Sequence, residues 1–370
     1  MKRGAGPENR VRDGGGSRGR AAAAGIGTGV EVQAVDLDET GWLLDADTRE
    51  PVPHHGLRDY FADRLAPPPW ATDVLVYVHG WQTSPRSARR TAERLLALLR
   101  ANLAAHPAQY PALTDATAKG FRPWCVVVRW PSSSAVTPAG YRRIRDRAHA
   151  MGARDGGGHA AHILGRLLGY LDTERADPRA APVLANRDGQ YLHLVGHSFG
   201  CRFLCEAVQW AADARLEDTL GWSAAERSPS RPFTADSMLL FQMAARRDAF
   251  LTRFPGILPG DGHDGAPLRG PIVTTYSRHD RATGFWHLRA ERQAGIGHSG
   301  IGPAPAPMFT TRLLPVDERY PLSVLDHRFV NVDASEVYVR GRRLNPAGAH
   351  SDHVRPESAH LLLTLADCSR

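Results

Sequence analysis

The feature that most constrains this chain is the pentapeptide Gly-His-Ser-Phe-Gly at Gly196–Gly200. An apolar run typical of a buried strand precedes it at Tyr191–Val195, and a helical apolar pattern follows at Cys201–Ala214. A G-x-S-x-G sequence between a strand and a helix is typical of a nucleophile elbow, a turn too tight for side chains at its two glycines. Such a turn raises the hydroxyl of Ser198 above the sheet edge and directs the Phe199 N–H toward a developing oxyanion.

Strands and helices are expected to alternate along most of the chain, and the central strand candidates are apolar throughout, as strands buried on both faces are. This alternation predicts an α/β protein with a mostly parallel central sheet and helices on both faces. Together with the elbow it predicts the α/β-hydrolase fold. Further strands are expected at Val30–Val35, Gly41–Leu44, Asp73–Val78, Cys125–Trp130, Met238–Met243, Ile272–Tyr276 and Phe329–Val332, and further helices at Pro85–Ala105, His159–Leu171 and Pro356–Ala366.

The chain is expected to form one domain over residues 31–370, preceded by a tail. Residues 1–30 are rich in Gly, Arg and Ala and nearly lack large apolar side chains, so we expect them to be disordered. Two long connections rich in Gly and Pro are predicted at about 254–271 and 295–315. Long loops in a compact domain often act as lids, and we expect the second to cover part of the site.

The basic charge balance does not indicate a nucleic-acid-binding protein. The formal net charge is +7, but only Lys2 and Lys119 among the 46 basic residues are lysines, and the arginines are scattered over the chain. A solvated basic surface explains this pattern better than a nucleic-acid footprint does.

The four cysteines show no metal-ligand spacing, and the sequence predicts neither a metal nor an organic cofactor. Free thiols are typical of a reducing compartment. No secretory signal and no run of 18 apolar residues is recognisable, so we expect a cytoplasmic protein without a transmembrane segment. The sequence does not indicate the oligomeric state.

A catalytic acid is expected after Ser198, because hydrolases of this fold place nucleophile, acid and base in that order along the chain. Asp280 lies just beyond the predicted strand Ile272–Tyr276, where a carboxylate can orient an imidazole. Asp248, which follows the preceding strand, is the alternative. Asp280 is the preferred candidate.

A base is expected after the last strand. The segment Gly348–His353 lies between that strand and the last helix, and small neighbours leave the ring of His350 free to reach Ser198. His353 and His327 remain alternatives, and His327 is the weaker because it begins a strand.

The turn His79-Gly80-Trp81 is expected to supply the second oxyanion donor, the N–H of Trp81, beside that of Phe199. The rings of Trp81 and Trp130 are candidates for substrate binding. They predict an apolar acyl site that disfavours charged substrates, since burial of an unpaired charge is costly.

With these residues placed, the chain resembles the serine-hydrolase branch of the α/β-hydrolase superfamily and, more narrowly, a group of uncharacterised bacterial esterase-like proteins classed as a domain of unknown function. The resemblance spans about residues 70–366 and implies Ser198 as nucleophile, Asp280 as acid and His350 as base. The chain departs from that group at Phe199 and in the wide spacing between acid and base. The resemblance rests on Tyr77–Trp81, Arg129–Ser132 with Tyr141 and Asp146, Gly196–Gly200, Ser277–Asp280 and Gly348–Asp352.

The leading functional hypothesis is a serine hydrolase that acts on a small acyl substrate, a carboxylic ester or related compound, through an acyl-enzyme. Amides and thioesters would use the same groups. The alternative is a non-catalytic interaction protein on a hydrolase scaffold, because a fold does not determine a function.

Overall fold

The computed structural model describes residues 31–115, 119–153, 157–175, 189–212, 234–258, 267–339 and 346–370. All of them belong to one compact unit, Glu31–Arg370. The tail predicted at residues 1–30 lies outside the described residues, and so do residues 259–266 of the first long connection.

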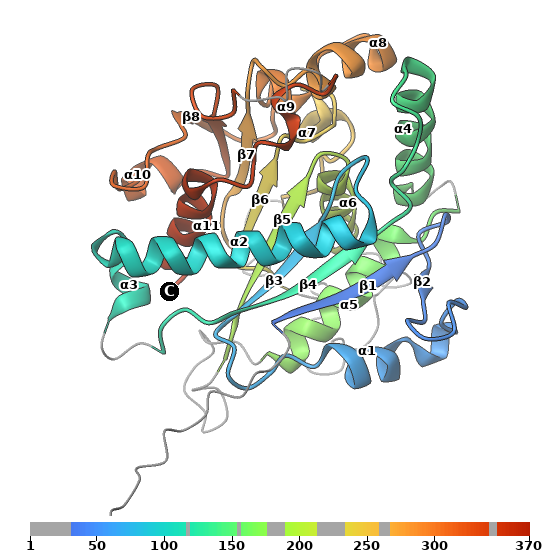
Figure 1. Ribbon diagram of the computed structural model, residues 1–370, viewed down its shortest axis with the longest axis horizontal. Helices are drawn as coiled ribbons and strands as arrows, with labels where there is room; N and C mark the ends of the chain where they lie inside the picture. Colours follow the sequence, from blue (N-terminus) through green and yellow to red (C-terminus); the bar gives the residue numbers. More distant parts are fainter. Residues whose placement is uncertain are drawn as a thin grey trace, which may run out of the picture. The chain divides into compact units, whose positions relative to one another are not determined.

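A mixed sheet of nine strands organises the described residues, in the order β2-β1-β4-β3-β5-β6-β7-β9-β8 (Figure 1). Every pairing in it is parallel except that of β2 with β1. The mostly parallel α/β sheet predicted from the sequence is therefore confirmed. The strands are β1 (Val32–Leu37), β2 (Leu43–Leu44), β3 (Asp73–Val78), β4 (Pro123–Arg129), β5 (Tyr191–His197), β6 (Ser237–Phe241), β7 (Ile272–Tyr276), β8 (Met308–Arg312) and β9 (Phe329–Asp333).

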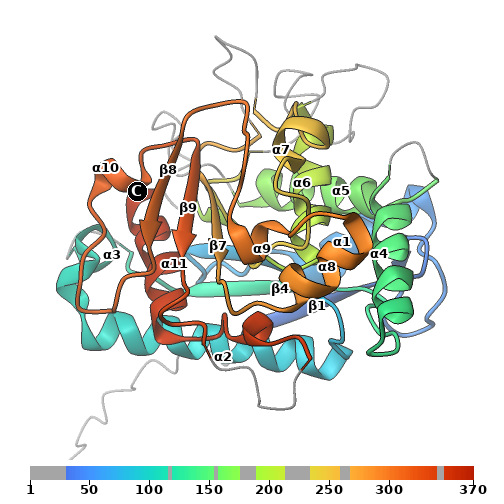
Figure 2. The same cartoon turned by 90° about the horizontal axis from the view of Figure 1, so that it is seen from above.

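Helices cover both faces of the sheet, as Figures 1 and 2 show. Residues alternate along each strand between the two faces, so that Val76 of β3 packs in one apolar core and Leu75 in the other. The first core includes α1 (Leu57–Leu65), α4 (Pro138–Gly152), α5 (Ala160–Glu174) and α6 (Gly200–Ala212). The second includes α2 (Pro85–Ala105), α3 (Pro111–Thr114) and α11 (Pro356–Cys368).

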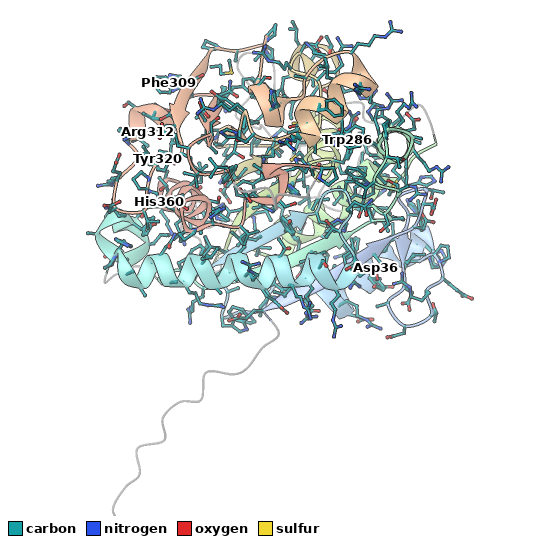
Figure 3. All side chains as sticks on the ribbon, turned by 45° about the horizontal axis from the view of Figure 1, so that its top comes forward. Asp36, Trp286, Phe309, Arg312, Tyr320 and His360 are labelled. Atoms are coloured by element: carbon teal, nitrogen blue, oxygen red, sulfur yellow. The ribbon has the colours of Figure 1, made fainter. Side chains whose placement is uncertain are left out.

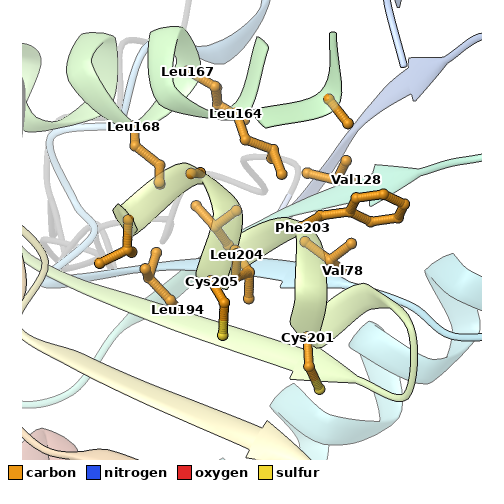
Figure 4. Close-up of a cluster of buried hydrophobic side chains, with 14 of the residues drawn as sticks. Val78, Val128, Leu164, Leu167, Leu168, Leu194, Cys201, Phe203, Leu204 and Cys205 are labelled. Atoms are coloured by element: carbon orange, nitrogen blue, oxygen red, sulfur yellow. The ribbon is translucent and has the colours of Figure 1, made fainter. Parts of the chain in front are cut away.

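The first core fixes the helix that follows the elbow. Figure 4 shows Leu164 and Leu168 of α5 facing Leu204 of α6, with Leu194 of β5 beneath them. These side chains are at most 1% exposed. Burying four leucines contributes on the order of 8 kcal/mol of transfer free energy, an upper estimate that holds α6 against β5.

The connection predicted at 295–315 is irregular over more than half of its length but is not a loop throughout. It contains α9 (Ile296–Ser299) and the edge strand β8, which pairs with β9 alone. The sequence did not indicate β8 because its residues are exposed or half-exposed and include two threonines and an arginine, and because glycines and prolines precede it. The sequence also did not predict α1 or α4. The remaining short helices of the described residues are α7 (Ala249–Thr252), α8 (His287–Glu291) and α10 (Leu322–Leu325).

Candidate active site

The turn after β5 carries Ser198 in the left-handed region of backbone space, with φ at +56°. This conformation is unfavourable for a residue with a Cβ, so the surroundings must hold it in place. The Ser198 N–H donates to the carbonyl oxygen of Phe241 over 3.0 Å. A Cβ at Gly200 would lie 2.3 Å from the carbonyl oxygen of Val78, which explains the glycine by close approach of β3.

The three side chains predicted as nucleophile, base and acid form one hydrogen-bonded chain. Ser198 Oγ lies 2.7 Å from Nε2 of His350, and Nδ1 of that ring lies 2.8 Å from Oδ2 of Asp280. With its Nδ1–H donating to the carboxylate, the imidazole presents Nε2 as the acceptor for the serine hydroxyl. The residues are 1%, 4% and 0% exposed, respectively.

The loops that carry the acid and the base are joined by backbone contacts. Asp280 and Gly348 form an isolated antiparallel bridge, and the Ala349 N–H donates to the His279 carbonyl oxygen over 3.1 Å. Gly348 has φ at +63°, and a Cβ there would lie 2.5 Å from the same carbonyl oxygen. The bridge thereby brings Asp280 close to His350, although these two residues are 70 positions apart in the sequence.

Gln242, which sequence reasoning did not identify, holds both loops. Its Nε2 donates to Asp280 Oδ2 over 3.1 Å and to the Ala349 carbonyl oxygen over 3.2 Å. The other carboxylate oxygen, Oδ1, accepts the Thr283 N–H over 3.0 Å. Gln242 is fully buried with φ at +47°, and its place directly after β6 was the only signal in the sequence.

The amides of Trp81 and Phe199 are the two candidate oxyanion donors. Neither donates a hydrogen bond to another group within the described part of the chain. The turn that carries Trp81 approaches the elbow closely, since a Cβ at Gly80 would lie 2.6 Å from Cβ of Ser198. Free N–H groups beside a serine hydroxyl suit the stabilisation of an oxyanion.

Trp81 and Trp130, the candidate substrate-binding residues, are 8% and 4% exposed, respectively. Trp81 donates its indole N–H to Ser134 Oγ, and its ring meets that of Tyr141 edge-on at 5.3 Å. Trp130 donates its indole N–H to the His79 carbonyl oxygen over 2.7 Å and stacks on that imidazole at 5.9 Å. Trp130 therefore packs between the turn that precedes Trp81 and α6, where its ring meets that of Phe203 edge-on at 5.2 Å.

The alternative acid and bases lie in other surroundings. The Asp248 carboxylate accepts hydrogen bonds from Nε and Nη2 of Arg246, each over 3.0 Å. His327 stacks on Phe309 at 4.9 Å. None of these residues has a hydrogen bond to Ser198 in the part of the chain described here.

His353, the nearer alternative base, stacks on His197 with ring centroids 3.9 Å apart. His197 in turn places its Nε2 2.8 Å from the His350 carbonyl oxygen. Burial, with His350 nearby, lowers the pKa of His353 to about 3, and burial also holds the pKa of His197 well below its usual value. Two neutral rings therefore support the loop that carries His350.

Within the described ranges, no group of three or more His, Cys, Asp or Glu side chains could hold a metal ion. None of the helices described there is long and apolar enough to cross a membrane.

Comparisons with known proteins give little further information. No protein-family model matches the sequence, and no curated protein matches it. TT1662 from Thermus thermophilus is 14% identical with a TM-score of 0.33, over 81% of this chain and 89% of that one. Phospholipase PlaB from Legionella pneumophila, solved in complex with thio-NAD, is 17% identical with a TM-score of 0.22, over 56% of this chain and 38% of that one. Both scores are too low to carry an argument.

The sheet order, the elbow after β5 and the loops that follow β7 and β9 define a hydrolase-like α/β fold. The Ser–His–Asp chain lies at the carboxyl ends of the parallel strands, where proteins with open α/β sheets bind their ligands.

Proposed function

We propose that this chain is a serine hydrolase that cleaves a carboxylic ester or related acyl compound through an acyl-enzyme. The observation that carries the proposal is the hydrogen-bonded chain from Ser198 Oγ through the His350 imidazole to the Asp280 carboxylate, at 2.7 and 2.8 Å. Such a geometry is recognised by its roles and not by its sequence positions. The left-handed backbone of Ser198 supports the same function, because strain of this kind is frequent at catalytic residues.

In the first half of the proposed reaction, His350 accepts the hydroxyl proton as Ser198 Oγ attacks the substrate carbonyl carbon. The carbonyl oxygen becomes an oxyanion between the Trp81 and Phe199 amides. When the C–O bond to the leaving group breaks, the imidazolium returns its proton to the departing alkoxide. Asp280 stabilises the imidazolium between these steps without taking its proton.

In the second half, a water molecule gives a proton to His350 and attacks the acyl carbon. The bond to Ser198 Oγ then breaks, and the serine recovers its proton from the imidazolium. The carboxylic acid is released. The proposed reaction uses protein groups and water only.

The exposure of the site bears on substrate access. Ser198 and His350 are almost fully buried, so we expect neighbouring side chains to move before a substrate reaches Oγ. Burial also favours the chemistry, because the amides and the carboxylate act more strongly where water is excluded.

A fluorophosphonate probe tests the proposal, since it phosphonylates an activated serine with release of fluoride. We expect labelling at Ser198 by peptide mass, and loss of both label and ester turnover in Ser198→Ala. Turnover should fall by roughly 10³-fold or more, as in other triads. Circular dichroism should show that the variant is folded.

Ser299→Ala is the matched control and should label like the wild type. A folded wild type that takes no label and turns over no ester would favour the interaction-protein alternative.

We retain the cytoplasmic expectation within this proposal, on the ground that Cys125, Cys201, Cys205 and Cys368 are free thiols.

A further inference from the structure

Beside the elbow, α4, α6 and the segment after α8 hold buried polar atoms that lack a hydrogen-bond partner within the described part of the chain. They are Tyr141 Oη, His149 Nε2, Arg202 Nε and Gln293 Oε1. Buried polar groups in folded proteins are almost always paired, so a group of unpaired ones requires an explanation. Their position next to the candidate nucleophile points to a ligand.

Of these four residues, Arg202 has the largest free-energy cost of burial, because it carries a charge. It lies in the first turn of α6, where its N–H donates to the Phe199 carbonyl oxygen, and only 7% of it is exposed. Among the described residues no carboxylate oxygen lies within ion-pair distance of its guanidinium. Burial lowers the pKa of Arg202 to about 10, so it keeps its charge at neutral pH. A buried cation without a direct partner is strongly unfavourable unless a ligand completes it.

The acidic residues nearest to this charge each have another cation. Glu206, one turn further along α6, binds Arg253 Nε at 2.9 Å. Glu291, at the end of α8, lies 3.6 Å from Arg145 Nε. Each of these ion pairs is neutral by itself, so Arg202 is the buried cation that has no direct partner among the described residues, and Glu206 and Glu291 act on its charge only from a longer distance.

A cavity of about 280 Å³ lies between α4 and α8, which are neighbours in both Figure 1 and Figure 2. Arg142 and Arg289 line it and no carboxylate does; the other lining residues are Pro138, Trp286 and Ala290. Trp286, labelled in Figure 3, donates its indole N–H to the carbonyl oxygen of Pro346, in the segment that leads to His350. The cavity is therefore basic and lies beside the loop of the candidate base.

The helix α4 lines the cavity and also packs against α6, which carries Arg202. Arg145 donates to the carbonyl oxygen of Ala290, a residue of the cavity wall, over 2.6 Å. Arg145 also binds Asp146, whose side chain is 62% exposed and so points to solvent. Arg145 is thus paired with carboxylates, and the positive charge of this region comes from Arg142 and Arg289 at the cavity and from Arg202 on α6. A field of this sign attracts anions.

Tyr141 connects α4 to the elbow. Its ring lies 5.3 Å from that of Trp81 and 5.5 Å from that of Phe199, the residues whose amides are the proposed oxyanion donors. Its hydroxyl is buried without a partner. A hydroxyl that has no hydrogen-bond partner among the described residues, on a ring that packs against both of these residues, is available to a substrate bound there.

We propose that the acyl part of the substrate ends in a carboxylate, which enters through the cavity between α4 and α8 and binds Arg202 and the Tyr141 hydroxyl. The inference rests on the proposed acyl-enzyme chemistry and specifies its substrate class. Arg202 is a single buried cation, which matches a monoanionic carboxylate better than a phosphate dianion, and a guanidinium binds carboxylate oxygens in a planar, two-pronged geometry. This proposal reverses the expectation, drawn from the tryptophans in the sequence, that the site disfavours charged substrates.

Paired substrates test this directly. The 4-nitrophenyl monoester of glutaric acid and its primary-amide counterpart have the same shape and differ in charge. We expect kcat/KM of the wild type to favour the acid by about tenfold or more, as charge-assisted hydrogen bonds to a buried cation would. Arg202→Met should remove that preference, and Tyr141→Phe should reduce it. Arg143→Met, an exposed arginine on α4, is the control and should keep the wild-type ratio.

Two further measurements separate this inference from the proposed function. Glutarate should bind Ser198→Ala in calorimetry and fail to bind Ser198→Ala/Arg202→Met, while inorganic phosphate should bind more weakly than glutarate. Arg202→Met should melt at the wild-type temperature or above, because it removes an unpaired buried charge. Glutarate binding without probe labelling would reject the hydrolase and keep the anion site. Labelling without any preference for the acid, or a clearly lower melting temperature of Arg202→Met, would overturn the anion site.

Discussion

At the scale of single residues, the Asp280 carboxylate has a partner for each of its oxygens. Oδ2 accepts from His350 Nδ1 and Gln242 Nε2, and Oδ1 accepts the Thr283 N–H. Three donors surround a side chain that is fully buried. A group with its own N–H donors in this position would face other donors and lose hydrogen bonds.

Asp280→Asn should therefore reduce turnover by roughly 10²–10⁴-fold, because the amide favours the wrong imidazole tautomer and breaks the bonding around the carboxylate. The rate of probe labelling and ester turnover both measure this. Asp248→Asn is the matched control and should have little effect, since Asp248 binds Arg246 and not a histidine. The reverse ranking of the two variants would move the acid to Asp248.

At the scale of elements, Arg370 ties the end of α11 to the start of β3. Its guanidinium binds both carboxylate oxygens of Asp73, at 2.9 and 2.8 Å, and stacks on the Tyr191 ring. Asp73 is fully buried and also lies 3.0 Å from His193 Nε2. β3 leads at its other end to the turn of Trp81, so the pair anchors a strand that supports the site.

Arg370→Ala should lower the free energy of unfolding by about 3 kcal/mol, because it leaves a buried carboxylate without its main cation. Urea denaturation measures the difference. Arg312→Ala breaks the exposed pair with Glu318 and should change stability by less than about 1 kcal/mol. Equal effects of the two variants would show that the Asp73 pair does not anchor β3.

At the scale of the whole molecule, several buried histidines are neutral in the folded state. Burial depresses their pKa below that of the unfolded chain, so the unfolded chain takes up more protons as the pH falls below about 6.5. Stability is then full above that pH and declines toward the folded pKa. The residues are His79, with a pKa of about 4, His353, with a pKa of about 3, and His197, whose pKa burial holds well below its usual value.

The free energy of unfolding should fall between pH 6.5 and pH 4 by up to about 1.4 kcal/mol per pH unit for each such histidine. Urea denaturation at pH 7 and pH 5 measures the slope. His353→Phe should reduce it by about one proton, whereas His55→Phe, at an exposed position, should not. A free energy that stays constant between pH 7 and pH 5 would contradict the neutral buried histidines.

The sequence by itself determined the features that depend on neighbouring residues. Apolar runs predicted the central strands β3, β4 and β5, since a strand buried on both faces has no polar side to show. The glycines around Ser198 indicated the tight turn because their lack of a Cβ is a local property. The chain order expected of acid and base then favoured Asp280 and His350 as candidates over Asp248, His353 and His327.

Only the tertiary structure decided what depends on distant residues. The backbone bridge of Asp280 with Gly348 and the double hydrogen bond of Gln242 join separate loops. The lack of a direct ion-pair partner for Arg202 among the described residues likewise depends on which helices pack around it. The edge strand β8 exists because β9 offers it a partner, although its own residues indicate a loop. Such contacts leave no periodic pattern in a sequence, because their energy arises when the chain brings remote groups together and excludes water from them.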